Sequence, residues 1–181
     1  MTSAPLSPKP RAFTLVELLV VISIIALLSS IILPITSKVR GYARRTRCCS
    51  SLGQLGKALN LYVDDHDNWY PCASCMPSTE PEGGPPRIRD LLGRYAVPAI
   101  FECPDDRPTD PEYHFASYFI GEGSSYEWAE LLNRLKVGQP HPYAPIDVAI
   151  VPILRDYEPF HAGGSRKGIN GLFVDGRVES F

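Results

Sequence analysis

Cysteine is the residue type in this chain with the widest choice of chemistry. The five cysteines are Cys48, Cys49, Cys72, Cys75 and Cys103. In an oxidising compartment they predict disulfides: Cys48 with Cys103 is the favoured pair, Cys72 and Cys75 could close a short loop, and Cys49 is left over. Buried free thiols are one alternative, and a zinc site built from Cys72, Cys75, Cys103 and a histidine is another. A second Cys-x-x-Cys, typical of such zinc sites, is missing.

Three aspartates, Asp64, Asp65 and Asp67, cluster where a long helix is expected to end. Acidic groups at a helix C-terminus face the negative end of the helix dipole, so a positive group should compensate them. Calcium prefers oxygen ligands of this kind, although the spacing differs from that of an EF-hand loop. A solvated turn or a nearby arginine is the other interpretation. Calcium at these aspartates is therefore a weak hypothesis, and the sequence predicts no metal centre.

His161 and Asp175 could form an acid–base pair. A hairpin turn explains Asp175 equally well, and His161 could simply hydrogen-bond a neighbouring loop. The chain contains no Gly-x-Ser-x-Gly elbow, no phosphate-binding loop and no His-Glu-x-x-His helix. We therefore expect no enzymatic activity and no cofactor.

The location of these groups depends on an apolar segment near the N-terminus. No charged residue occurs from Leu18 to Leu33, and with its flanks the segment 13–35 has about the 20 residues that cross a bilayer. It is apolar on all sides, unlike a helix with one wet face, and longer than the apolar run of a signal peptide. Glu17 lies inside it, where a carboxylate costs about 2.5 kcal/mol or more. Glu17 is therefore a functional candidate, unless it lies solvated at the headgroup level.

The charge distribution separates the chain into two parts. Residues 1–63 carry eight Lys and Arg against one acidic residue, a net charge of +7, whereas residues 64–181 carry ten against nineteen, a net charge of −9. Such asymmetry indicates two environments, one near an anionic membrane surface and one in water. The acidic part is a poor candidate for nucleic-acid binding.

A helical pattern continues beyond the apolar segment. Cys48, Leu52, Leu55, Leu59 and Tyr62 alternate at spacings of four and three, which places them on one face. We predict one helix over residues 13–63, roughly 75 Å long, with a possible bend at Pro34. Only the domain formed by residues 64–181 can cover the apolar stripe. Because Cys48 lies on this stripe and Cys103 precedes Pro104 in a loop, the two thiols could meet.

The downstream domain reads as a mixture of short helices and strands. Residues 77–86 are rich in proline and glycine and predict a surface loop. Asp175-Gly176 is a strong hairpin signal. A long helix packed on a small antiparallel sheet is an α+β fold. We expect helices at Ile88–Tyr95 and Ser125–Leu135, and strands at Phe115–Ile120, Val148–Leu154, Gly171–Val174 and Arg177–Phe181.

The N-terminal residues resemble a known processing signal. The run from Arg11 through Ala12, Phe13 and Glu17 is similar to the cleavage and methylation signature of prepilins, with Ala12 where glycine is usual. The resemblance implies a leader over residues 1–12, cleavage between Ala12 and Phe13 by a prepilin peptidase, N-methylation of Phe13 and a pilin-like fold. It also implies that Glu17 pairs with the Phe13 amino terminus of a neighbouring subunit in a filament, and that Pro34 is the usual helix proline.

The C-terminal residues resemble a pseudopilin-like subfamily. Cys48-Cys49-Ser50-Ser51-Leu52, Phe101-Glu102-Cys103-Pro104 and a final His161…Asp175-Gly176 carry this similarity, with Ser165-Arg166-Lys167 as a loop insertion. It implies a structural subunit of a type II secretion pseudopilus or type IV pilus-like filament. Its partners would be the prepilin peptidase and other pilin or pseudopilin subunits.

The membrane topology follows from the same resemblance. The chain would cross the inner membrane once, with its C-terminal domain in the periplasm. Five Lys and Arg follow the apolar segment and two precede it, a distribution that by itself favours the opposite orientation. Long domains are exported largely regardless of flanking charge, so the resemblance takes precedence. The alternative function is a membrane-anchored extracytoplasmic binding module that uses a prepilin-type leader.

Overall fold

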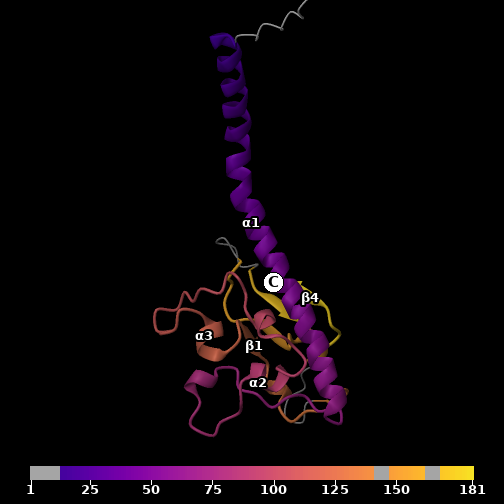
Figure 1. Ribbon diagram of the computed structural model, residues 1–181. Helices are drawn as coiled ribbons and strands as arrows, with labels where there is room; N and C mark the ends of the chain where they lie inside the picture. The colour runs from indigo at the N-terminus through magenta and orange to yellow at the C-terminus, as the bar shows by residue number, and fades with distance from the viewer. Residues whose placement is uncertain (1–12, 141–146, 162–167) are drawn as a thin grey trace, which may run out of the picture. The chain divides into compact units, whose positions relative to one another are not determined.

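The computed structural model describes residues 13–140, 147–161 and 168–181 (Figure 1). The expected leader, including Ala12, and the loop insertion at Ser165-Arg166-Lys167 lie outside these residues. The chain divides into two compact units at Arg40–Gly41. The long helix α1 (Leu15–Asp65) contributes to both units, and each unit is described separately below.

The first unit contains the apolar part of α1. Leu15–Leu33 is a stretch of 19 residues with a mean hydropathy of 2.8, and none of its side chains is buried. At 1.5 Å per residue it is about 28 Å long, close to the thickness of a bilayer hydrocarbon core. It is therefore long and apolar enough to cross a membrane once. The helix is continuous through Pro34, and a bend at that residue stays a prediction.

The second unit is built on the remaining part of α1. The predicted stripe is confirmed: Cys48, Leu52 and Leu55 are fully buried, Leu59 is nearly so, and Tyr62 is partly buried beside them. Because these residues recur at spacings of three and four, they form one face that the domain covers. The residues packed around this face come from several later segments of the domain and include Leu92, Phe101, Tyr126, Trp128, Leu132, Leu154 and Leu172.

A four-stranded antiparallel sheet completes the α+β fold that the sequence predicts. The strands are β1 (Tyr126–Trp128), β2 (Leu154–Asp156), β3 (Asn170–Leu172) and β4 (Val178–Ser180), in the order β1-β2-β3-β4. Tyr126 pairs with Asp156, Leu154 with Leu172, and Leu172 with Val178. These small strands lie close to the domain part of α1 (Figure 1), and the Leu172 side chain contacts α1 at Gly56.

Two glycines shape the C-terminal hairpin. The hairpin is confirmed, but its strands are Asn170–Leu172 and Val178–Ser180 instead of the expected Gly171–Val174 and Arg177–Phe181. Gly176 adopts a φ of +83°, a left-handed conformation that glycine reaches without strain, and the turn closes through hydrogen bonds between Phe173 and Arg177 and between Gly176 and Phe173. Gly171, in the middle of β3, has no room for a side chain. A Cβ there would lie 2.9 Å from both Pro152 and Phe181.

Several short elements differ from the sequence-based expectation. The segment expected as a strand at Phe115–Ile120 contains α3 (Tyr118–Glu122), because the Ser117 hydroxyl caps its first turn and Gly123 ends it in a left-handed conformation. The helix expected at Ser125–Leu135 is instead β1 followed by a 3-10 turn at Glu130–Leu132, because Tyr126 and Trp128 alternate into the core.

The remaining differences concern element bounds. The expected helix at Ile88–Tyr95 is the shorter α2 (Ile88–Leu92). The segment Val148–Leu154 begins with a 3-10 turn at Val148–Ile150, capped by the Asp147 side chain, so β2 starts only at Leu154. The proline-rich loop at residues 77–86 contains a 3-10 turn at Pro77–Thr79. A separate 3-10 turn spans Pro98–Phe101, after α2.

Candidate functional site

The first candidate site is the start of α1, where Thr14 and Glu17 cap each other. Glu17 Oε2 accepts hydrogen bonds from the Thr14 backbone N–H at 2.9 Å and from the Thr14 hydroxyl at 2.7 Å, and the Glu17 N–H donates to Thr14 Oγ1 at 3.2 Å. This is a capping box, in which a Thr and the Glu three residues later satisfy each other's backbone donors. The Thr-x-x-Glu spacing could have indicated it from sequence.

Glu17 therefore has a local function as well as the expected one in assembly. Thr14 supplies hydrogen bonds but no positive charge, so the carboxylate charge is uncompensated within the described part of this unit. Phe13, Thr14 and Glu17 are all exposed. The carboxylate in the first turn of this apolar helix can thus pair with a cation that comes from another molecule.

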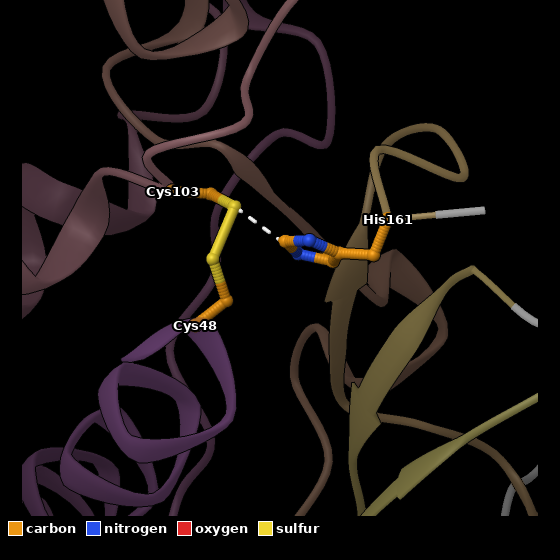
Figure 2. Close-up of side chains that lie close together, drawn as sticks. All are labelled: Cys48, Cys103 and His161. Carbon is orange, nitrogen blue, oxygen red and sulfur yellow. Dashed lines mark hydrogen bonds between the residues drawn. A yellow bond between two sulfur atoms is a disulfide. The ribbon is translucent and has the colours of Figure 1, made fainter. Parts of the chain in front are cut away.

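The second candidate site lies in the domain and is centred on a disulfide. Cys48 on α1 and Cys103, two residues after the 3-10 turn at Pro98–Phe101, form the predicted bond, with a Cα–Cα distance of 5.4 Å (Figure 2). Cys48 is fully buried and Cys103 is 2% exposed. The bond joins residues 55 positions apart and so ties α1 to the domain.

His161 points at this disulfide from the loop after β2 (Figure 2). Its Nε2 lies 3.3 Å from Cys103 Sγ, and its Nδ1 lies 3.0 Å from Asp105 Oδ2. Asp105 also forms an ion pair with Arg44 on α1. Burial lowers the pKa of His161, although the Asp105 carboxylate opposes this shift.

The pair of His161 with Asp175 is not formed. Asp175 lies in the exposed hairpin and forms an ion pair with Arg177 at 3.3 Å, whereas Asp105 takes the place beside the imidazole. Asp175 thus has the turn function that the sequence offered as the alternative. No sequence pattern links His161 to Asp105, because 56 residues separate them.

Asp156 is a buried acidic residue beside His161 that the sequence analysis missed. Its carboxylate accepts hydrogen bonds from the backbone N–H and the side-chain amide of Asn170, at 2.7 and 2.9 Å. Burial raises its pKa to about 7. Its Oδ1 has no hydrogen-bond partner among the described residues. The one sequence signal for this buried carboxylate is its position, two residues after the core residue Leu154, which places it on the inward face of a strand.

The other three cysteines are free thiols in the described part of the chain. The loop-closing bond between Cys72 and Cys75 is not formed. The alternative zinc set of Cys72, Cys75, Cys103 and a histidine is not assembled either, since Cys103 is bonded to Cys48. Burial and the neighbouring Glu130 raise the pKa of the Cys75 thiol to about 11. Cys49 lies near Asn170, with Sγ 3.5 Å from Oδ1.

The three aspartates after the helix remain at the surface. Asp64, Asp65 and Asp67 are exposed, and Asp65 accepts a hydrogen bond of 2.9 Å from the Tyr95 hydroxyl. Asp67 adopts a φ of +52°, typical of a turn. Within residues 13–140, 147–161 and 168–181, these carboxylates do not gather into a group of three potential metal ligands, so calcium binding stays an untested hypothesis.

Comparison with known protein families gives one match, and it covers the region of the first site. The model of the prokaryotic N-terminal methylation motif matches residues 8–33, which include Phe13, Glu17 and the apolar part of α1. No curated protein and no solved structure matches the chain. The matched motif belongs to prepilins, which a peptidase processes and which assemble with other pilin subunits. Together with the one apolar helix long enough to span a bilayer among the described residues, it supports single-pass anchoring in a membrane.

Proposed function

We propose that this prepilin-type chain is a structural subunit of a filament, either a type II secretion pseudopilus or a type IV pilus-like fibre. The observation that carries the proposal is the methylation motif on a helix whose apolar stretch of 19 residues, Leu15–Leu33, is exposed throughout. Such a surface needs an apolar partner on every side. Before assembly that partner is the bilayer, and after assembly it is the apolar helices of neighbouring subunits.

Processing would precede assembly. We infer a leader over residues 1–12, removed between Ala12 and Phe13, and N-methylation of the new Phe13 terminus. The mature chain would then have the long helix over residues 13–63 and the acidic domain over residues 64–181. A periplasmic location of the domain agrees with its buried disulfide, because such bonds persist in oxidising compartments.

Glu17 would set how subunits meet. In the isolated chain its carboxylate bonds only to Thr14 within the described residues. In a filament it would accept the positive charge of a neighbour's Phe13 amino group, and a buried charge is tolerated when it is paired in this way. The pairing requires cleavage, since the amino group at Phe13 exists only after the leader is removed.

The variant Glu17→Gln tests this function. Glutamine also completes a capping box, so the helix start should persist while the charge is lost. We expect normal cleavage, normal membrane insertion and few or no filaments, because one unpaired buried charge per subunit costs about 3 to 5 kcal/mol. The matched control is Ser23→Ala on the same helix. It removes a hydroxyl that, among the described residues, bonds only to the Leu19 carbonyl.

Three measurements in the same cells separate the outcomes. Mass spectrometry of the wild-type chain should give a mass that starts at N-methylated Phe13, and an intact Met1 terminus despite an active peptidase would contradict the proposal. Filament yield should fall in Glu17→Gln and not in Ser23→Ala. Abundant mature subunit without filaments, in the wild type as well, would favour the membrane-anchored binding module.

A further inference from the structure

One cluster of potential metal ligands stands apart from the filament function. Cys48, Cys103 and His161 each offer one ligand atom, and these atoms lie within 4.8 Å of one another (Figure 2). They form the single group of three or more such residues in the described parts of the chain. All three side chains are buried, with exposed fractions of 0–2%.

The separation of these atoms fits zinc geometry. Tetrahedral zinc with Zn–S near 2.3 Å and Zn–N near 2.0 Å requires sulfur and nitrogen ligands to be about 3.5 Å apart. Cys103 Sγ and His161 Nε2 are 3.3 Å apart. The two sulfurs are closer while they are bonded to each other, and opening the bond would let them separate to the spacing that a shared ion needs.

The imidazole is already oriented as a metal ligand. Asp105 Oδ2 lies 3.0 Å from Nδ1, and since a carboxylate only accepts, Nδ1 carries the hydrogen. The lone pair of Nε2 therefore faces a disulfide sulfur that has no hydrogen to donate. A carboxylate behind the histidine in this manner is the usual arrangement around zinc ligands. Arg44 in turn holds Asp105.

Asp156 can supply the fourth ligand. Its Oδ2 lies 3.9 Å from His161 Nε2, and its Oδ1 is buried without a hydrogen-bond partner among the described residues. The carboxylate thus keeps unused acceptor capacity next to His161, although it stands outside the 4.8 Å cluster of Cys48, Cys103 and His161 and would have to move toward the sulfurs to share an ion with them. Two sulfurs, one nitrogen and one oxygen form a donor set that zinc accepts.

We propose that the chain with a reduced Cys48–Cys103 pair binds one zinc ion through both thiolates, His161 Nε2 and the Asp156 carboxylate. The disulfide and the metal site are alternative states of the same cysteines. A dithiol or phosphine reductant supplies two electrons to the S–S bond, and zinc then displaces the two thiol protons. In reverse, a disulfide oxidant takes two electrons from the two thiolates and two protons from water and becomes two thiols, while the Cys48–Cys103 bond forms and zinc is released.

The metal state would direct the correct disulfide. Cys49 is adjacent to Cys48 and is a free thiol in the structure, so in the reduced chain it would be a competing partner for Cys103 during oxidation. Zinc would hold Cys48 and Cys103 against each other and lower the reactivity of both until an oxidant arrives. This inference goes beyond the filament function and does not rest on it.

Cobalt substitution provides the test. The full chain in detergent micelles is reduced with a phosphine under anaerobic conditions, freed of reductant and titrated with Co²⁺ and then Zn²⁺. We expect one Co²⁺ per chain with a thiolate-to-cobalt charge-transfer band, which zinc removes and which the oxidised chain does not show. Cys103→Ser and His161→Gln should lose the band, and the control Cys72→Ser with Cys75→Ser should keep it.

The variant Asp105→Asn tests the proposal even if the variants that remove a ligand fail to fold. Asp105→Asn keeps every ligand but weakens the orientation of His161, so its metal affinity should fall about 10- to 100-fold. The proposal is overturned if the reduced wild type shows no charge-transfer band or does not fold with zinc. It is equally overturned if the Cys72 and Cys75 control loses the band while His161→Gln retains it.

Discussion

Loss of the Cys48–Cys103 bond should destabilise the domain by about 4 kcal/mol. The bond joins residues 55 positions apart. Closing a loop of that length removes about 14 cal/mol/K of entropy from the unfolded chain, which at 25 °C amounts to about 4 kcal/mol. Since both cysteines are buried, the variant Cys48→Ala with Cys103→Ala also loses packing, so the loss should be no smaller than this figure.

Tryptophan fluorescence provides the assay. Trp128 is 1% exposed and donates a hydrogen bond of 2.9 Å to Asn133, so its emission should change strongly when the core opens. Urea unfolding of the full chain in detergent micelles should give a lower midpoint for the double variant. Thermal unfolding should shift down by roughly 8 to 16 °C. The control is Cys72→Ala with Cys75→Ala, because neither residue is bonded in the described structure.

Two results would refute this reasoning. A double variant that unfolds within about 1 kcal/mol of the wild type would show that the bond does not constrain the unfolded chain. A control that loses as much stability would show that general loss of thiols, rather than the Cys48–Cys103 bond, explains the effect. Reduction of the wild-type chain should also lower the midpoint, but by no more than in the double variant, because the reduced cysteine side chains still fill their places in the core.

Three further predictions concern the domain. Asp106 accepts hydrogen bonds from the backbone N–H groups of Tyr118 and Phe119 at the start of α3 and from the buried Ser125 hydroxyl. Asp106→Ala should therefore lower the unfolding free energy measured in urea by about 3 kcal/mol. The exposed control Asp110→Ala should change it far less. Alkylation of Cys75, followed by peptide mass spectrometry, should accelerate about tenfold per pH unit up to pH about 11, and Glu130→Gln should make it faster at pH 8; a flat profile would contradict the raised pKa. Gly171→Ala should lower the thermal midpoint, because its Cβ would lie 2.9 Å from Pro152; an unchanged midpoint would mean that the strand shifts freely.

Much of the molecule could be predicted from short-range patterns in the sequence. The apolar run with Glu17, the stripe from Cys48 to Leu59 and the turn at Asp175-Gly176 each depend on residues a few positions apart, and local spacing determines which helix face or turn they form. The capping box of Thr14 and Glu17 belongs to the same class, because it depends on a spacing of three residues. These patterns also predicted the α+β fold.

Only the tertiary structure decided the environment of the buried polar groups. The segment Ser125–Leu135 contains a strand rather than a helix, because Tyr126 and Trp128 pair with β2, which lies about 28 positions further along the chain. His161 pairs with Asp105 rather than Asp175, and Asp156 becomes buried beside it, since the disulfide and the sheet bring distant loops together. Contacts between residues this far apart depend on how the whole core packs, and no local spacing encodes them.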